Sequence, residues 1–164
     1  KWSLRCCRYD ENVAVTILDL PQQIALAQEN IAKAGFSHRI AFHAVDMLSP
    51  ATLPGDADVW WMSQFLDCFS PDQIVAMLTR VAQVMKPGAR LCIMELFWDA
   101  QKFEAASFSL NATSLYFTCM ANGNSRFYSV ERFYHYLNLA GFQVDERHDN
   151  LGVGHTLLIC QKKK

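Results

Sequence analysis

The sequence has almost no net charge and no long apolar run, and each absence excludes a class of partner. Its 164 residues carry a formal net charge of -1, so no electrostatic argument favours nucleic acid or an anionic membrane as a partner. No apolar stretch reaches the length that crosses a bilayer, and no secretory signal is visible. We therefore expect no nucleic acid and no membrane among its partners.

Metal-binding and disulfide patterns are also lacking. The six cysteines form no C-x-x-C pair, and the histidines show neither H-x-x-x-H nor H-E-x-x-H spacing. Several cysteines stand in apolar, strand-like runs, which is typical of buried free thiols in a reducing compartment. We expect a cytoplasmic protein without a metal site.

The chain alternates between apolar runs and helical patterns, and its length suffices for one sizeable core. This alternation favours an α/β fold, a doubly wound and mostly parallel sheet with helices on both faces. The short turn before the last strand favours an antiparallel hairpin at the sheet edge. We predict strands at 13–20, 39–47, 58–65, 89–97, 143–149 and 155–161, and helices at 1–10, 21–35, 71–86, 103–121 and 129–141.

Two acids follow the first two predicted strands. The run 13–20 is apolar almost throughout, which predicts a strand buried on both faces, and it closes on Asp19. Asp46 stands in the same place after the second strand. An acid at the carboxyl end of a parallel strand lies where nucleotide-type ligands bind and can accept hydrogen bonds from ribose hydroxyls. The alternative for either residue is an acid that merely ends a strand or caps a turn.

Five segments carry a family resemblance: LDLP at 18–21, RIAFHAVDM at 39–47, ADVWWMSQFLDCFSPDQ at 57–73, VMKPGARLCIMELF at 84–97 and SRFYSVERFYHYLNLAGF at 125–142. Together they resemble the catalytic domain of class I S-adenosylmethionine-dependent methyltransferases with a Rossmann-like fold. The resemblance is specifically to small-molecule O-methyltransferases. It implies S-adenosyl-L-methionine as cofactor and a hydroxyl of a small aromatic or polyketide/polyene-like compound as methyl acceptor.

The resemblance also implies where the cofactor binds. Asp19 would hold the ribose, and Leu20 would pack on the adenine. Asp46 and Met47 would contact the adenine edge. Ser63 and Gln64 would lie near the methionine end.

The acceptor pocket is expected along residues 103–128, which are rich in aromatic side chains. Relatives use the corresponding helices as the pocket wall, so Asn111, Tyr116 and Arg126 would be its polar groups. Packing in the core is the favoured alternative for most of the aromatic residues, and a salt bridge at a helix entry is the alternative for Arg126. We expect the final hairpin, with His148 and His155, to lie away from the methyl-transfer centre.

The position of the histidine base in plant-type relatives is filled here by Asp67. Methyl transfer to oxygen is an in-line displacement that is assisted by a base. With an unperturbed pKa of about 3.9, an aspartate is a poor base for a phenol unless burial raises that pKa. Asp67 would deprotonate or orient the hydroxyl, or else cap the turn before helix 71–86. Glu95 matches an acid that supports the base in relatives and is the second catalytic candidate.

Family members open this domain with a strand and a glycine-rich turn, and both are missing here. None of the seven glycines falls before position 35. We therefore expect residues 1–164 to be a partial catalytic domain that lacks its first strand, this turn and the N-terminal dimerisation domain. The resemblance then implies a homodimer formed through regions absent from this chain.

Two other functions remain open. One is a non-catalytic member of the same fold that serves as a binding or dimer partner. The other is a nicotinamide-dependent oxidoreductase, because an acid after a strand also serves that cofactor. The lack of a Y-x-x-x-K pair counts against the oxidoreductase.

Overall fold

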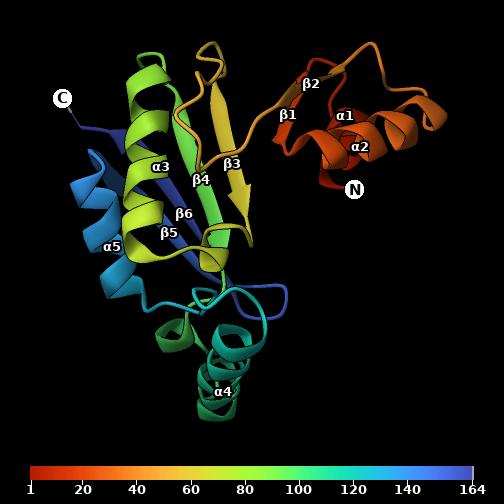
Figure 1. Ribbon diagram of the computed structural model, residues 1–164. Coiled ribbons are helices and arrows are strands. Elements are labelled where there is room, and N and C mark those ends of the chain that lie inside the picture. Colours follow the sequence, from red (N-terminus) through yellow and green to blue (C-terminus); the bar gives the residue numbers. More distant parts are fainter. Residues whose placement is uncertain (164) are drawn as a thin grey trace. The chain divides into compact units, whose positions relative to one another are not determined.

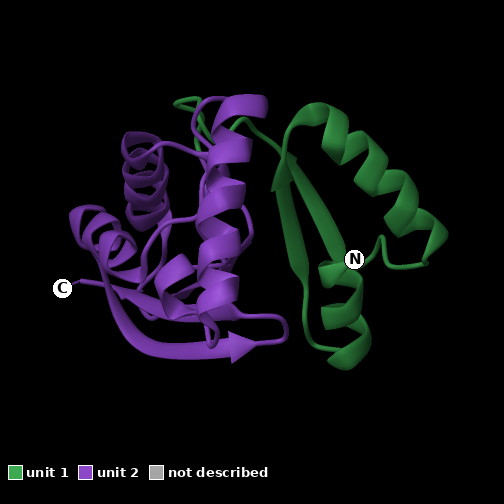
Figure 2. Cartoon of the chain, turned by 90° about the horizontal axis from the view of Figure 1, so that it is seen from below, with its two compact units in different colours: residues 1–52 green, residues 53–164 purple. Residues whose placement is uncertain are grey.

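The computed structural model describes residues 1–163. They form two compact units, which comprise residues 1–52 and 53–164 of the chain (Figure 2). None of the described helices is long and apolar enough to cross a membrane.

The first unit is a two-stranded parallel sheet with two helices. Its elements in chain order are α1 (Trp2–Tyr9), β1 (Val15–Asp19), α2 (Pro21–Lys33) and β2 (Ile40–Ala44). The strands pair in register from Val15 opposite Ile40 to Asp19 opposite Ala44. Its core joins both helices to the sheet through Cys7, Ile31 and Ile40, packed with Leu4, Val15, Ile17, Phe36 and Phe42.

Strand β1 is less buried than the sequence predicted. Val15 and Ile17 lie on the face that packs on the core, whereas Thr16 on the other face is exposed. The prediction of a strand buried on both faces is therefore wrong for this unit. The reason is that α1 and α2 contribute to one cluster on one face of a sheet with only two described strands.

The second unit is built on a four-stranded mixed sheet in the order β3-β4-β6-β5. Its elements are β3 (Val59–Ser63), η1 (Leu66–Cys68), α3 (Pro71–Val84), β4 (Arg90–Glu95), η2 (Trp98–Ala100), α4 (Glu104–Met120), α5 (Val130–Leu139), β5 (Phe142–Leu151) and β6 (His155–Lys162). Strands β3 and β4 are parallel, and β6 runs against both of its neighbours, β4 and β5.

The antiparallel hairpin of β5 and β6 lies at one edge of this sheet, as predicted. The described strands form two sheets, because β1 pairs only with β2 and β3 only with β4, so the expected sheet is interrupted between β1 and β3. The distribution of the helices differs from the prediction. Helices α3 and α5 lie side by side on one face of this sheet (Figure 1), so the second unit does not show helices on both faces.

Helix α3 shows how local sequence signals place these elements. Pro71 occupies its first turn, and Ser70 forms a capping box with Gln73: the Ser70 N–H donates to the Gln73 side chain at 2.9 Å, and the Gln73 N–H donates to Ser70 Oγ at 3.4 Å. The predicted apolar stripe is buried and comprises Ile74, Met77, Leu78 and Val81. Opposite it, alternate residues of β4 and β6 are buried, namely Leu91, Ile93, Glu95, Thr156, Leu158 and Cys160.

Helix α4 departs from the expectation of core packing. None of its residues is buried, and the side chains of Phe108 and Tyr116 are 74% and 62% exposed. The helix extends beyond the end of the sheet and contacts η2 (Figure 1). The prediction that most aromatic side chains of this region pack in the core is therefore wrong. Exposed apolar surface of this extent is typical of a binding surface.

Candidate functional site

The first unit brings the two predicted acids to neighbouring strand ends. Asp19 is the last residue of β1 and pairs with Ala44, two positions before Asp46. One oxygen of each carboxylate is used locally: Asp19 Oδ1 accepts the N–H of Leu20, and Asp46 Oδ1 accepts the N–H of Leu48, both at 2.8 Å. Both residues are exposed. The other carboxylate oxygens can therefore accept hydroxyl groups of a ligand.

Apolar side chains stand directly beside these acids. Leu20 caps the start of α2 with an extended backbone, and its side chain is 45% exposed. Met47 follows Asp46 and is half-buried. An exposed leucine next to a carboxylate suits a ligand that joins a flat ring to a hydroxylated sugar.

In the second unit, polar side chains lie along the edge of the sheet where β3 and β4 end and β6 begins. Ser63 pairs with Met94, the Gln64 N–H donates to the Met94 carbonyl at 2.9 Å, and Glu95 pairs with Thr156. His155 lies along the same edge, with its Nε2 atom 2.9 Å from Nε2 of Gln64. This histidine therefore lies beside Gln64, one of the predicted cofactor-binding residues. Because β6 is antiparallel to β4, its first residue lies at the carboxyl end of β4.

Glu95 is buried, and only one of its two carboxyl oxygens has hydrogen-bond partners among the described residues. Its side chain is 2% exposed, and Oε1 accepts the N–H groups of Phe65 and Leu66, each at 2.9 Å. Among the described residues, no partner bonds to Oε2. Burial, assisted by the nearby charge of Asp67, raises the pKa of Glu95 to about 8, although the two N–H groups oppose this shift. Glu95 is therefore mostly protonated at neutral pH.

Asp67 lies in η1, directly after the two amides that Glu95 holds. It is half-buried, and burial raises the pKa of its carboxyl above the ordinary value. The charge of Asp67 also raises the pKa of Glu95, so the two carboxyl groups interact. The structure thus supplies the burial that an aspartate needs to act as a base.

The segment 121–129 holds the turn that carries Asp67. Three consecutive carbonyls of this turn accept hydrogen bonds: Asp67 from the Arg126 N–H at 2.9 Å, Cys68 from Asn122 Nδ2 at 3.0 Å, and Phe69 from the Tyr128 hydroxyl at 2.6 Å. The side-chain oxygen of Asn122 also accepts two backbone N–H groups of its own segment. These hydrogen bonds hold the segment 121–129 against the turn that contains Asp67, the candidate base.

Replacing Asn122 by alanine is expected to lower the free energy of unfolding by about 1 kcal/mol, because one exposed side chain makes these contacts. Urea unfolding followed by circular dichroism measures the change. Asn124→Ala is the control, since the contacts of Asn124 in this segment are made by its backbone. Equal stability of the two variants would contradict a fastening role for the Asn122 side chain.

The three predicted acceptor-binding residues are not brought together. Asn111 is exposed and donates to the Ser107 carbonyl of its own helix at 3.1 Å. Tyr116 is five positions further along α4, so the two side chains point about 140° apart around the helix. The guanidinium of Arg126 bonds to the Asn124 carbonyl at 3.1 Å and lies over the Tyr128 ring. Only the backbone of Arg126 meets Asp67.

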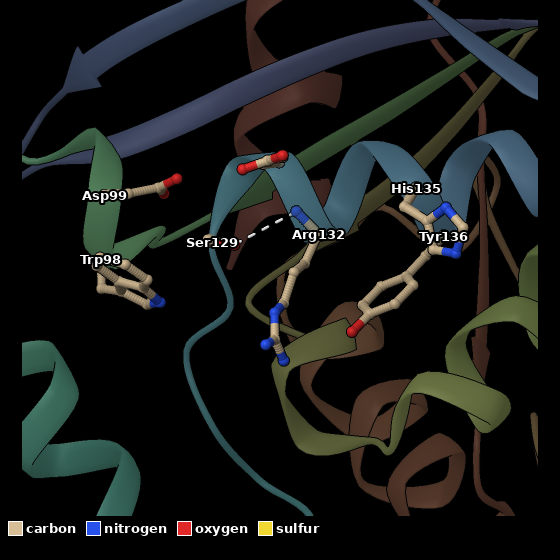
Figure 3. A pocket seen from close by; sticks show the side chains of 7 residues that line it. Trp98, Asp99, Ser129, Arg132, His135 and Tyr136 are labelled. Atoms are coloured by element: carbon tan, nitrogen blue, oxygen red, sulfur yellow. Dashed lines mark hydrogen bonds between the residues drawn. The ribbon is translucent and has the colours of Figure 1, made fainter.

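A separate pocket of about 670 Å³ lies where η2 meets the start of α5 (Figure 3). None of the predicted site residues lines it; its lining is Trp98, Asp99, Ser129, Glu131, Arg132, His135 and Tyr136. Two of its polar groups cap α5, since Asp99 accepts the Val130 N–H at 2.8 Å and Ser129 accepts the Arg132 N–H at 3.3 Å. These contacts explain both residues without a ligand.

Sequence reasoning missed or set aside His155 and Tyr128 as parts of the site. His155 was recoverable, because a hairpin that returns antiparallel to β4 must place its first residue beside the end of β4. No local signal marks Tyr128, whose hydroxyl reaches a carbonyl 59 residues away.

Comparison with known proteins gives concordant matches. A family model described as the O-methyltransferase domain matches residues 5–143. The 3-hydroxy-5-methyl-1-naphthoate 3-O-methyltransferase of Streptomyces sahachiroi is 32% identical over 111 residues, which are 66% of this chain and 32% of that protein. The chain thus spans about a third of the curated relative that it matches.

Solved structures share the fold. The S-adenosylmethionine-dependent methyltransferase SibL matches with a TM-score of 0.83 and 23% identity, over 98% of this chain and 47% of that one. The O-methyltransferase NcsB1, in complex with S-adenosylmethionine and 2-hydroxy-5-methyl naphthoic acid, matches with a TM-score of 0.80 and 18% identity, over 97% and 44%. Since the family model matches most of its length, the chain belongs to the O-methyltransferase domain family.

Proposed function

We propose that this chain takes part in the S-adenosyl-L-methionine-dependent transfer of a methyl group to a hydroxyl of a small aromatic or polyketide/polyene-like acceptor. The observation that carries the proposal is the pair of Asp67 and Glu95. A buried carboxyl with an unpartnered oxygen lies beside a half-buried aspartate whose pKa is raised. Perturbed carboxyl groups that interact with each other are typical of functional sites.

The strand ends of the first unit fit the nucleoside part of the cofactor. Asp19 has a free carboxylate oxygen for the ribose hydroxyls, and the exposed Leu20 offers an apolar surface to the adenine. Asp46 and Met47 would contact the adenine edge. By the resemblance, Ser63 and Gln64 serve the methionine end. When bound, the cofactor supplies an electrophilic methyl group on its sulfonium.

Residues of the second unit are proposed to remove the proton of the acceptor hydroxyl. Asp67 accepts the proton of the acceptor hydroxyl, which makes the oxygen a better nucleophile. Glu95 remains protonated and holds the turn through the N–H groups of Phe65 and Leu66, so Asp67 stays in place. The segment 121–129 fixes the same turn from its other side. Asn111, Tyr116 and Arg126 are proposed as acceptor contacts.

The relatives suggest which acceptor to test first. The curated relative is named for a hydroxynaphthoate, and NcsB1 was crystallised with a hydroxy naphthoic acid. Both compounds are aromatic rings that carry a hydroxyl and a carboxylate. 3-Hydroxy-5-methyl-1-naphthoate is therefore the first probe of acceptor methylation.

Replacing Asp19 by asparagine is expected to weaken binding of S-adenosylhomocysteine about 10- to 100-fold, because a charge-assisted hydrogen bond to the ribose is lost. Titration calorimetry on the full-length protein measures this change. The matched control is Glu29→Gln, which removes an exposed carboxylate of α2 that pairs with Lys33.

Two results would redirect the proposal. Unchanged binding in Asp19→Asn would remove Asp19 from the cofactor site. Absence of binding in the unaltered full-length protein would contradict the enzyme and favour a non-catalytic binding partner of the same fold.

A further inference from the structure

Gln64 and His155 meet across the end of β4, although 91 residues separate them in the chain. Strands β3 and β6 flank β4, so two strand spacings of about 4.8 Å lie between their backbones. The Gln64 and His155 side chains together span this distance, with the amide nitrogen 2.9 Å from His155 Nε2. Gln64 also has a φ of 47°, a left-handed conformation that is uncommon for residues other than glycine.

This contact bears on which ring nitrogen of His155 carries the proton. In the orientation that the structure gives the Gln64 amide, its nitrogen faces the ring and donates, so His155 Nε2 accepts. The neutral ring then carries its hydrogen on Nδ1. Within the described part of the chain, no residue bonds to Nδ1, and the side chain is half-buried. One N–H donor is thus left for a ligand at these strand ends.

We propose that His155 orients the methyl acceptor by donating from Nδ1 to a carboxylate or carbonyl oxygen on the acceptor ring. Gln64 is the positioning residue, because it fixes the tautomer that exposes this donor. The inference rests on the proposed methyl transfer, which places the acceptor hydroxyl at Asp67. It narrows the acceptor to hydroxylated aromatic rings that also carry an oxygen acceptor.

The polarity of the strand ends supports this assignment. Asp67 offers oxygen atoms to a hydroxyl proton, whereas His155 offers a hydrogen. Glu95 pairs with Thr156, the residue after His155, so His155 lies at the same strand ends as the carboxyl pair, with its side chain on the other face of the sheet. A ligand with a hydroxyl at one end and an oxygen acceptor at the other satisfies both groups. The reversed orientation would place oxygen lone pairs against a carboxylate.

The test compares 3-hydroxy-5-methyl-1-naphthoate with the corresponding naphthol that lacks the carboxylate, in the full-length protein. His155→Leu is expected to lower kcat/KM for the naphthoate about tenfold, mainly through KM, and to leave the naphthol almost unchanged. His155→Asn should retain activity within about threefold, because its amide nitrogen replaces the Nδ1 donor. His148→Leu, in the neighbouring strand β5, is the control that leaves both substrates unaffected.

Nitrogen-15 NMR of the imidazole provides a readout that does not depend on turnover. The hydrogen is expected on Nδ1 in the unaltered protein and on both nitrogens in exchange in Gln64→Asn, whose shorter amide cannot reach the ring. Addition of the naphthoate should shift the Nδ1 signal.

A hydrogen on Nε2, an absent shift, or equal losses for both substrates would overturn the role of His155. If the protein still binds S-adenosylhomocysteine in that case, only this inference fails. If it neither binds S-adenosylhomocysteine nor methylates either compound, the proposed function fails as well.

Discussion

Asp67→Asn is expected to lower kcat for methyl transfer by about 10²- to 10⁴-fold, the usual contribution of a positioned general base. The asparagine keeps the size of the side chain but cannot take the hydroxyl proton. Binding of S-adenosylhomocysteine should be unchanged. Initial rates with 3-hydroxy-5-methyl-1-naphthoate, measured together with calorimetry, separate the two effects.

Asp72→Asn is the matched control for this variant. Asp72 is an exposed acid in the first turn of α3, close to Asp67 in sequence but outside the carboxyl pair. Its replacement should leave kcat unchanged. If Asp67→Asn instead keeps kcat within about threefold of the unaltered protein, Asp67 caps its turn and is not the base.

The free energy of unfolding is expected to fall as pH rises from about 4.5 to about 8, with Glu95 as the main cause. Glu95 has a pKa of about 8 in the folded protein against an ordinary value of 4.5. Between these values the folded chain binds one proton that the unfolded chain has lost, so rising pH favours unfolding. The raised pKa of Asp67 acts in the same direction. The expected slope is about 1 kcal/mol per pH unit.

Urea unfolding at several pH values between 5 and 8 measures this slope. Glu95→Gln removes the titrating group and should abolish most of the difference across the range. Glu131→Gln, an exposed acid in α5, is the control and should retain the slope of the unaltered protein. The same slope in Glu95→Gln would show that Glu95 is ionised in the folded protein at neutral pH.

The elements and their ends were predictable because their signals are local. Ser70 and Pro71 start α3 through contacts within one turn, and the apolar stripe from Ile74 to Val81 repeats with the helical period. The two acids of the first unit were predictable for a similar reason. Parallel strands place their carboxyl ends together, so Asp19 and Asp46 become neighbours once both strands are recognised.

The exposure of α4 could not be predicted in this way. Helix α4 is as rich in aromatic residues as a helix of the core. Composition alone does not show whether another element packs against the helix. Only the tertiary structure shows that Phe108 and Tyr116 find no described core to enter.

The sequence and its family resemblance predicted the candidate residues for the proposed reaction: Asp67 and Glu95 as acids, and Asp19 at a strand end. The tertiary structure decided their state. Burial of Glu95 and its bonds to Phe65 and Leu66 arise from a strand pair that brings residues 29 and 30 positions apart together. The site acquires His155 only because β6 returns antiparallel beside β4. The pKa of Glu95 and the tautomer of His155 depend on neighbouring groups from distant segments of the chain. A local sequence pattern contains no information about those neighbours.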